Sequence, residues 1–238
     1  MKKSIAPLIM AGIMTLASGC TNLGYKSPDD NSAYSQTIKN NKFSKYLKKN
    51  EFIVPDKVFS AYENASRTGP TYANSNGNGC AGTCIEDVID DEGKFIEILS
   101  NNGCSKKEIS DYCKIFSTKD NIVLRELPDE YSNYFEKALM HERMHYLQNN
   151  LNENDMQKIK DCWSKIMDKK YNNQDYSNIL SNECKSHEDR VKKEVMLKWE
   201  EMLPYMTTIE TDINEIIIKD YPEVYQIYNN MKEEAELK

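Results

Sequence analysis

The sequence is poor in the residues that build repetitive or low-complexity chains. Its 238 residues include only 9 glycines and 7 prolines, too few for a collagen-like or low-complexity polypeptide. It has no block of basic residues, and 38 acidic residues outnumber 31 basic ones, for a net charge of -7. Because phosphate binding needs clustered cations, we expect no nucleic-acid partner. Charged residues make up 29% of the chain, which excludes a polytopic membrane protein.

The longest apolar run lies at the N-terminus and is typical of an export signal. Two lysines precede the run Ile5–Leu16, which is too short to span a bilayer comfortably. The run leads into Ala-Ser-Gly-Cys, ending at Cys20, which resembles the lipobox of bacterial-type lipoproteins. The resemblance implies that residues 1–19 are a cleaved signal peptide and that Cys20 is lipidated. The alternative is an ordinary cleaved signal with an incidental cysteine.

Lipidation would place the mature chain outside the cytoplasm, held to a membrane by acyl chains such as palmitate. Acyl chains anchor by burying methylene groups, so no transmembrane helix is needed. Thr21 follows the lipid site, rather than the aspartate of an inner-membrane retention signal, which favours the outer membrane or cell surface. Removing the signal removes two lysines and no acid, so the net charge becomes -9. Residues 20–36 are polar and predicted to be a tether.

The cysteine count fits an exported protein. Six cysteines remain besides the lipidated one, and an even number in an exported chain predicts three disulfides. A zinc cluster is the alternative, but the sequence has no paired Cys-x-x-Cys spacing. We expect two of the bridges to fasten a Gly-rich loop to a capped helix, and the third to join Cys162 to Cys184. The six are Cys80, Cys84, Cys104, Cys113, Cys162 and Cys184.

Apolar periodicity predicts one α+β domain over residues 37–238, predominantly α-helical with a small sheet. A loop and small strands are expected over residues 50–84, with Phe52–Val54 and Val58–Tyr62 as short strands. A further strand is expected over Asn121–Leu127, which is β-branched at its start and is followed by a proline. Helices are expected over residues 85–99 (interrupted near Gly93), 105–116, 129–149, 155–171, 177–202, 208–219 and from 222 onward, with a capping box at Ser105 and Glu108.

The chemistry-bearing motif is His-Glu-Arg-Met-His, which begins at His141 inside the predicted helix 129–149. Residues four apart on a helix share one face, so His141 and His145 can bind one metal ion. The pattern resembles the His-Glu-x-x-His motif of the zincin metallopeptidases. The resemblance implies a Zn²⁺ cofactor, Glu142 as general base, and an edge strand just upstream that pairs with extended substrate. Arg143 is a charge where the family usually has none, and we expect it to point to solvent.

A catalytic zinc site needs a third protein ligand. The metzincin extension would require Gly and His where the chain has Gln148 and Leu151, so that subclass is excluded. Asn182-Glu-Cys-Lys-Ser-His187 resembles the gluzincin element Asn-Glu-x-x-Ser-Asp, which implies Glu183 as the third ligand. His187 is predicted either to donate a hydrogen bond to the oxyanion or to be the ligand itself. Glu188 and Glu194 are weaker candidates, and a solvated stripe of charges is the simplest alternative.

Together these features predict a membrane-anchored zinc metallopeptidase acting on peptides or proteins outside the cytoplasm. A related possibility is hydrolysis of cell-wall peptide cross-links, which uses similar zinc sites. The contrasting hypothesis is a non-catalytic surface lipoprotein, either an adhesin or an assembly module, with a vestigial metal site. Two exposed histidines on a surface helix would be consistent with that second hypothesis.

Overall fold

The computed structural model describes residues 43–66, 82–85, 89, 91–126, 132–170, 195, 198–208 and 212–236. These residues form a predominantly helical protein with one small sheet, which confirms the predicted α+β class. Several predicted features lie outside the described residues: the signal peptide, the lipidation site, the tether and most of the Gly-rich loop. The same holds for Cys80, Glu183, Cys184, His187, Glu188 and Glu194.

The sheet has three strands, β1 (Glu51–Val54), β2 (Gly82–Cys84) and β3 (Ile122–Arg125). Their order is β1-β3-β2, with β1 parallel and β2 antiparallel to β3. The strand upstream of the motif helix is therefore central, whereas the sequence predicted an edge strand there. Its first three residues are buried, as expected of a strand covered on both faces. The strand beside that helix at the sheet edge is β2.

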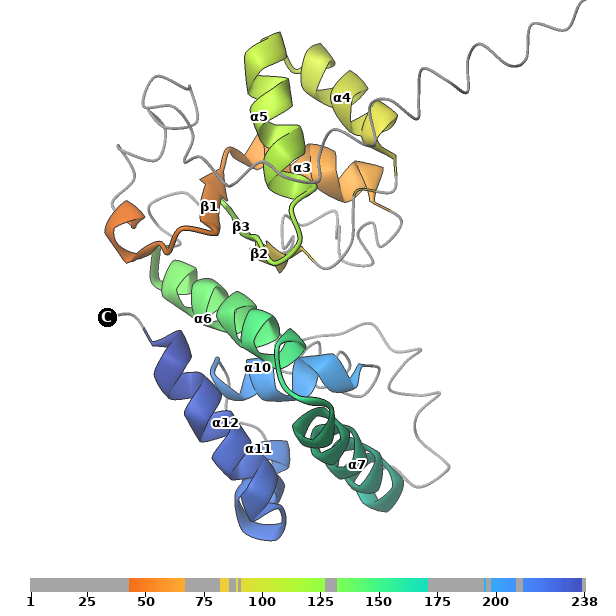
Figure 1. The fold of residues 1–238 in the computed structure, drawn as a ribbon, viewed down its shortest axis with the longest axis vertical. Helices are drawn as coiled ribbons and strands as arrows, with labels where there is room; N and C mark the ends of the chain where they lie inside the picture. The colour runs from red at the N-terminus through yellow and green to blue at the C-terminus, as the bar shows by residue number, and fades with distance from the viewer. Residues whose placement is uncertain are drawn as a thin grey trace, which may run out of the picture.

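Three helices cover one face of the sheet: α3 (Asp56–Ala65), α4 (Glu92–Asn101) and α5 (Lys106–Phe116). Figure 1 shows them on one side of the sheet and α6 on the other. The prediction of a strand over Val58–Tyr62 was wrong, because this segment lies within α3. The buried positions Val58, Phe59, Ala61 and Ala65 follow the helical spacing rather than alternating.

Local signals define the ends of α4 and α5. The Asp91 side chain accepts a hydrogen bond from the Lys94 amide, so α4 begins there and contains Gly93 in its first turn. The predicted capping box is confirmed: Ser105 accepts from the Glu108 amide, and the Glu108 carboxylate accepts from the Ser105 amide at 2.7 Å. Both helices pack around Phe116 in the core above the sheet.

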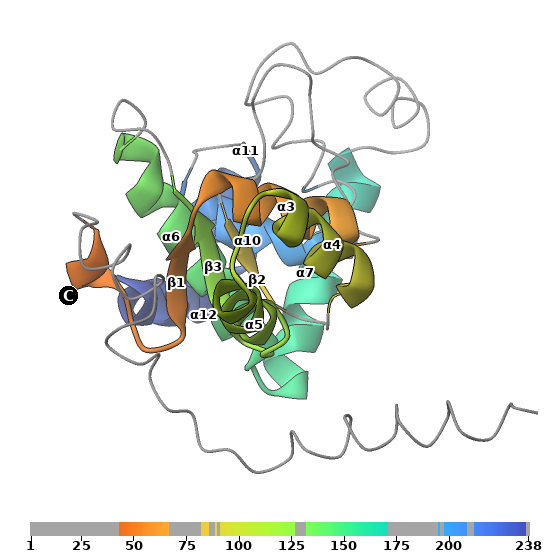
Figure 2. The same ribbon diagram turned by 90° about the horizontal axis from the view of Figure 1, so that it is seen from above.

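The second half of the molecule is a helical assembly below the sheet. It comprises α6 (Ser132–Asn149), α7 (Glu153–Lys170), the 3-10 turn η3 (Trp199–Glu201), α10 (Met202–Met206), α11 (Asp212–Asp220) and α12 (Pro222–Ala235). The proline at the start of α12 confirms the predicted first turn. Figure 1 shows α6 between the sheet and these helices, and in Figure 2, seen from above, α10 and α12 lie behind the strands. Its Leu139 packs toward the sheet, and its Met144 packs into the C-terminal core.

Three of the cysteines in the described part of the chain form no disulfide. Cys104, Cys113 and Cys162 are free thiols in this structure, so the predicted bridges to them are not seen. Cys162 is buried in the C-terminal core on α7. Among the described helices, none combines the length and the apolar character that crossing a membrane requires.

Candidate metal centre

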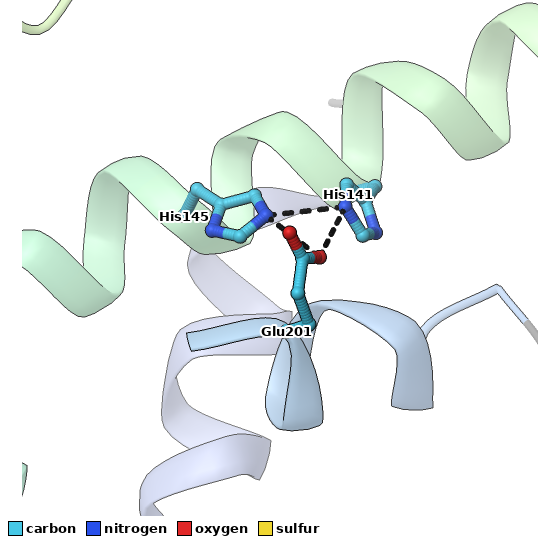
Figure 3. Close-up of side chains that lie close together, drawn as sticks. All are labelled: His141, His145 and Glu201. Carbon is cyan, nitrogen blue, oxygen red and sulfur yellow. Dashed lines mark hydrogen bonds and ion pairs between the residues drawn. The ribbon is translucent and has the colours of Figure 1, made fainter. Parts of the chain in front are cut away.

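The motif helix α6 presents its two histidines on one face, as the spacing predicted. His141 and His145 are both partly buried, and their Nε2 atoms lie 3.1 Å apart. The two rings meet edge to face at 75°. Figure 3 shows that each ring directs one nitrogen toward a common point. They are not the exposed histidines of a surface helix, because α6 lies between the sheet and the C-terminal helices.

The third residue at this point is Glu201, the last residue of η3. Its Oε2 atom lies 3.3 Å from Nε2 of His141 and 3.3 Å from Nε2 of His145. Figure 3 shows the carboxylate rising from η3 toward both rings. The three side chains offer one ligand atom each, all within 4.8 Å of one another. This is the donor set of a metal site with two imidazoles and one carboxylate.

The Glu201 carboxylate is held in an unusual electrostatic setting. Burial raises its pKa, but the two imidazoles lower it by more, so the pKa falls well below its usual range. The carboxylate is therefore ionised and able to act as a ligand. Oε2 is buried and makes no hydrogen bond that satisfies normal geometry within the described part of the chain. A buried anionic oxygen without a proper hydrogen bond is costly, and a cation between the three donors would satisfy it.

Helices α7 and α10 hold η3 in place. The Trp163 indole donates to the Val195 carbonyl at 2.7 Å, which fastens the chain just before η3. The Lys160 ammonium lies over the Trp199 ring, 4.7 Å from its centroid. On the far side, the Tyr205 ring of α10 packs against His141 with centroids 4.5 Å apart. The position of Glu201 thus depends on packing among α6, α7 and α10.

Glu142, the predicted general base, is buried beside the sheet edge. Its side chain runs along β2, so close that a Cβ atom on Gly82 would lie 2.9 Å from Glu142 Cγ and 3.3 Å from its Oε1. Only glycine leaves room for the carboxylate at this point of the strand. The antiparallel edge strand and the motif helix are therefore in direct contact.

Arg143 does not point to solvent, and that expectation was wrong. Its side chain is 3% exposed and forms a two-point ion pair with Glu51 of β1, at 2.7 and 2.8 Å. Arg143 lies two residues from each histidine, which places it on the opposite side of the helix. It therefore faces β1 and the end of α12. A charge at this position is tolerated because a buried carboxylate and backbone carbonyls satisfy it.

Sequence reasoning found two of the three gathered donors and missed Glu201. It proposed Glu183, with His187 as an alternative, and both lie outside the described residues. Glu201 falls inside the predicted helix 177–202. The only local signal for it is its place directly before the apolar run Met202–Pro204, which is buried. Such a signal marks a residue at the edge of a core but does not identify a ligand.

The fold and this cluster define an α+β protein with a candidate metal centre of two histidines and one glutamate, bordered by a buried glutamate. Compared with known proteins, the chain matches no family model, no curated protein and no solved structure.

Proposed function

We propose that this protein is a zinc metallopeptidase, anchored outside the cytoplasm by an N-terminal lipid. The observation that carries the proposal is the cluster of His141, His145 and Glu201 beside Glu142. Their donor atoms are 3.1 to 3.3 Å apart, near the edge of about 3.4 Å expected for a tetrahedron with ligand bonds of about 2.1 Å. Three protein ligands leave the fourth position of zinc open, as in catalytic rather than structural sites.

Glu142 directly follows His141 on α6, and its carboxylate is of the type that serves as a general base. Zinc supplies Lewis acidity when bound, polarising a carbonyl and lowering the pKa of water. The Glu142 carboxylate takes the proton from the attacking water and returns it to the leaving amine. The contact between Glu142 and β2 supports an extended peptide lying along this edge, as the zincin resemblance implies. In this proposal β2, rather than the central strand β3, is the strand that faces the substrate.

Metal analysis of residues 21–238 is the first test. We expect about one zinc per chain, lost in His141→Ala and in His145→Ala. Glu142→Gln should retain zinc, because Glu142 is not a ligand, and should lose hydrolysis by several orders of magnitude. Glu136→Gln is the matched control, because Glu136 is an exposed glutamate on the same helix. Cleavage can be followed by mass spectrometry on a mixture of unstructured peptides and on cell-wall peptides.

The rival function is a non-catalytic lipoprotein with a vestigial site. Two results would favour this adhesin or assembly role. One is a wild-type zinc affinity that is micromolar or weaker, and the other is equal peptide cleavage by the wild-type protein and by Glu142→Gln. Hydrolysis confined to cell-wall peptides would instead identify the substrate as peptide cross-links. The anchor is tested separately by acyl labelling, which we expect to be lost in Cys20→Ala while zinc binding persists.

A further inference from the structure

Gln148 lies three residues beyond His145 on α6, and it is completely buried. Full burial is uncommon for glutamine, because its amide must keep its hydrogen bonds. A leucine or methionine would fill a similar volume without polar atoms. Packing alone therefore does not account for an amide at this position.

The Gln148 amide reaches across to the element that carries the third donor. Its Nε2 atom donates a hydrogen bond to the Glu200 carbonyl at 3.0 Å. That carbonyl belongs to the planar peptide unit that joins Glu200 to Glu201. The bond thus fixes the orientation of the backbone from which the Glu201 side chain departs.

This contact differs from the other contacts that hold η3. The Trp163 and Lys160 contacts come from α7 and act on Val195, four residues before η3, and on Trp199, its first residue. The residue before η3, Lys198, provides no side-chain cap. Gln148 instead joins η3 to the helix that carries both histidines, so it connects all three donors independently of a metal ion.

The other end of the Gln148 amide is left unsatisfied. Its Oε1 atom is buried and has no hydrogen-bond partner within the described part of the chain. Burying a polar oxygen in this way is unfavourable. The one interaction that offsets this burial in the described residues is the bond to the backbone beside Glu201.

We propose that Gln148 is a positioning residue for the metal site, an inference that rests on the proposed function. By holding the Glu200–Glu201 peptide against α6, it places the carboxylate near both imidazoles before the metal binds. A ligand set that is arranged in advance binds its metal more tightly, and outer partners of this kind typically change metal affinity by about 10- to 100-fold.

The test is zinc affinity of Gln148→Met in the chain of residues 21–238, measured by competition with a chelator. Methionine keeps the length of the side chain but cannot donate the hydrogen bond. We expect an affinity loss of about 10- to 100-fold and an altered visible absorption spectrum of the Co²⁺-loaded protein. Gln157→Met is the matched control, since Gln157 is exposed on α7 and bonds only to Asp161 among the interactions described. It should leave both readouts unchanged.

A second background separates positioning from general stability. In Glu201→Gln protein the carboxylate ligand is gone, so Gln148→Met should cause no further loss of zinc affinity. An equal loss in both backgrounds, or wild-type affinity in Gln148→Met, overturns the inference and leaves the proposed function intact. Absence of zinc binding by the wild-type protein overturns both. Gln148→Leu is the second variant, and failure of both variants to fold with zinc present would assign Gln148 to folding instead.

Discussion

Single substitutions distinguish Glu201 from Glu183 as the candidate third zinc ligand. Glu201→Gln should lower zinc affinity by at least about 100-fold, more than the loss of an outer partner, because it removes a ligand. Glu183→Gln should leave the affinity within a few fold of wild type. Both variants can be measured by competition with a chelator. The opposite ranking would restore Glu183, the residue that the gluzincin resemblance indicated, as the third ligand.

Cys162 should be the least reactive of the described thiols in the reduced, folded protein. Burial raises its pKa to about 12, so only about one thiol in ten thousand is ionised at pH 8. The thiolate fraction should rise about tenfold per pH unit above pH 8, and the rate of alkylation by iodoacetamide should rise with it. The partly exposed Cys104 is the internal control and should be labelled faster.

Mass spectrometry of the labelled peptides measures both rates, and unfolding should remove the difference between them. Equal labelling in the folded state would contradict the buried position of Cys162. Peptide mapping without reduction addresses the predicted bridge separately. A peptide joining Cys162 to Cys184 would show that the protein pairs a cysteine that is free in this structure.

The predictable part of the site is the part encoded by local spacing. His141 and His145 had to share a face once the helix was recognised, and Glu142 had to lie beside them. Glu201 approaches from an element more than fifty residues later, through contacts of α7 and α10 that no local pattern encodes. Arg143 was misjudged for the same reason, because its partner Glu51 is ninety-two residues away.

The helices and strands, too, were predictable where their signals are local in sequence. The α5 helix was predictable because its capping box is local, and α12 because proline suits a first turn. The segment Val58–Tyr62 was misread because Val, Phe and Tyr favour strands, whereas their burial in this fold follows the helical period. The place of β3 in the sheet could not be read from sequence, since strand order depends on long-range pairing.

The contact between β2 and α6 predicts a specific effect of Gly82→Ala. The added Cβ would lie 2.5 Å from Leu124 Cδ2 and 2.9 Å from Glu142 Cγ. Since Leu124 is fully buried, the strain should lower the free energy of unfolding by about 1 to 3 kcal/mol. Hydrolysis should fall as well, because Glu142 is displaced, whereas zinc affinity should stay near wild type.

Gly93→Ala is the matched control for Gly82→Ala. Gly93 lies in the first turn of α4, and the nearest atom to an added Cβ is Asp91 Oδ1 at 3.5 Å. Alanine in a helix should leave stability unchanged or raise it by up to about 1 kcal/mol. Urea denaturation of the two variants compares the effects. Equal stability of the two variants would contradict the close approach of β2 to the motif helix.

Arg143 joins segments from both ends of the described chain. Its Nη2 donates to the carbonyl of Tyr46, the last residue of η1 (Ser44–Tyr46), at 2.7 Å. Its Nη1 donates to the Ala235 carbonyl at the end of α12, at 2.9 Å. Its Nε and Nη2 pair with Glu51. The guanidinium, with five N–H donors in a fixed plane, is suited to such a set of acceptors. The motif helix α6 is thereby fastened to the sheet and to the last helix together.

Arg143→Met should therefore be strongly destabilising even without metal. It leaves the buried Glu51 carboxylate unpaired, and breaking a buried pair in this way typically costs about 3 to 5 kcal/mol. Arg143→Lys should recover little, because one ammonium cannot reach acceptors on three segments. Arg143→Met combined with Glu51→Met should be more stable than Arg143→Met alone, since the uncompensated charge is gone.

Arg125 provides the comparison on the opposite face of the sheet. It pairs with Asp56 at 2.9 Å, whose side chain is 66% exposed, and with Glu63 at 2.6 Å, whose side chain is 17% exposed. The Arg143–Glu51 pair is more deeply buried, at 3% and 1% exposed. Arg125→Met should therefore cause a smaller loss than Arg143→Met, because water screens its pair with Asp56 and reaches Glu63 in part, whereas Glu51 would be left unpaired and fully buried. Urea denaturation of the zinc-free proteins measures all four variants. If Arg143→Met unfolds at the same urea concentration as Arg125→Met, the Arg143 cluster does not hold the motif helix α6, and the histidines owe their position to core packing around Leu139 and Met144 alone.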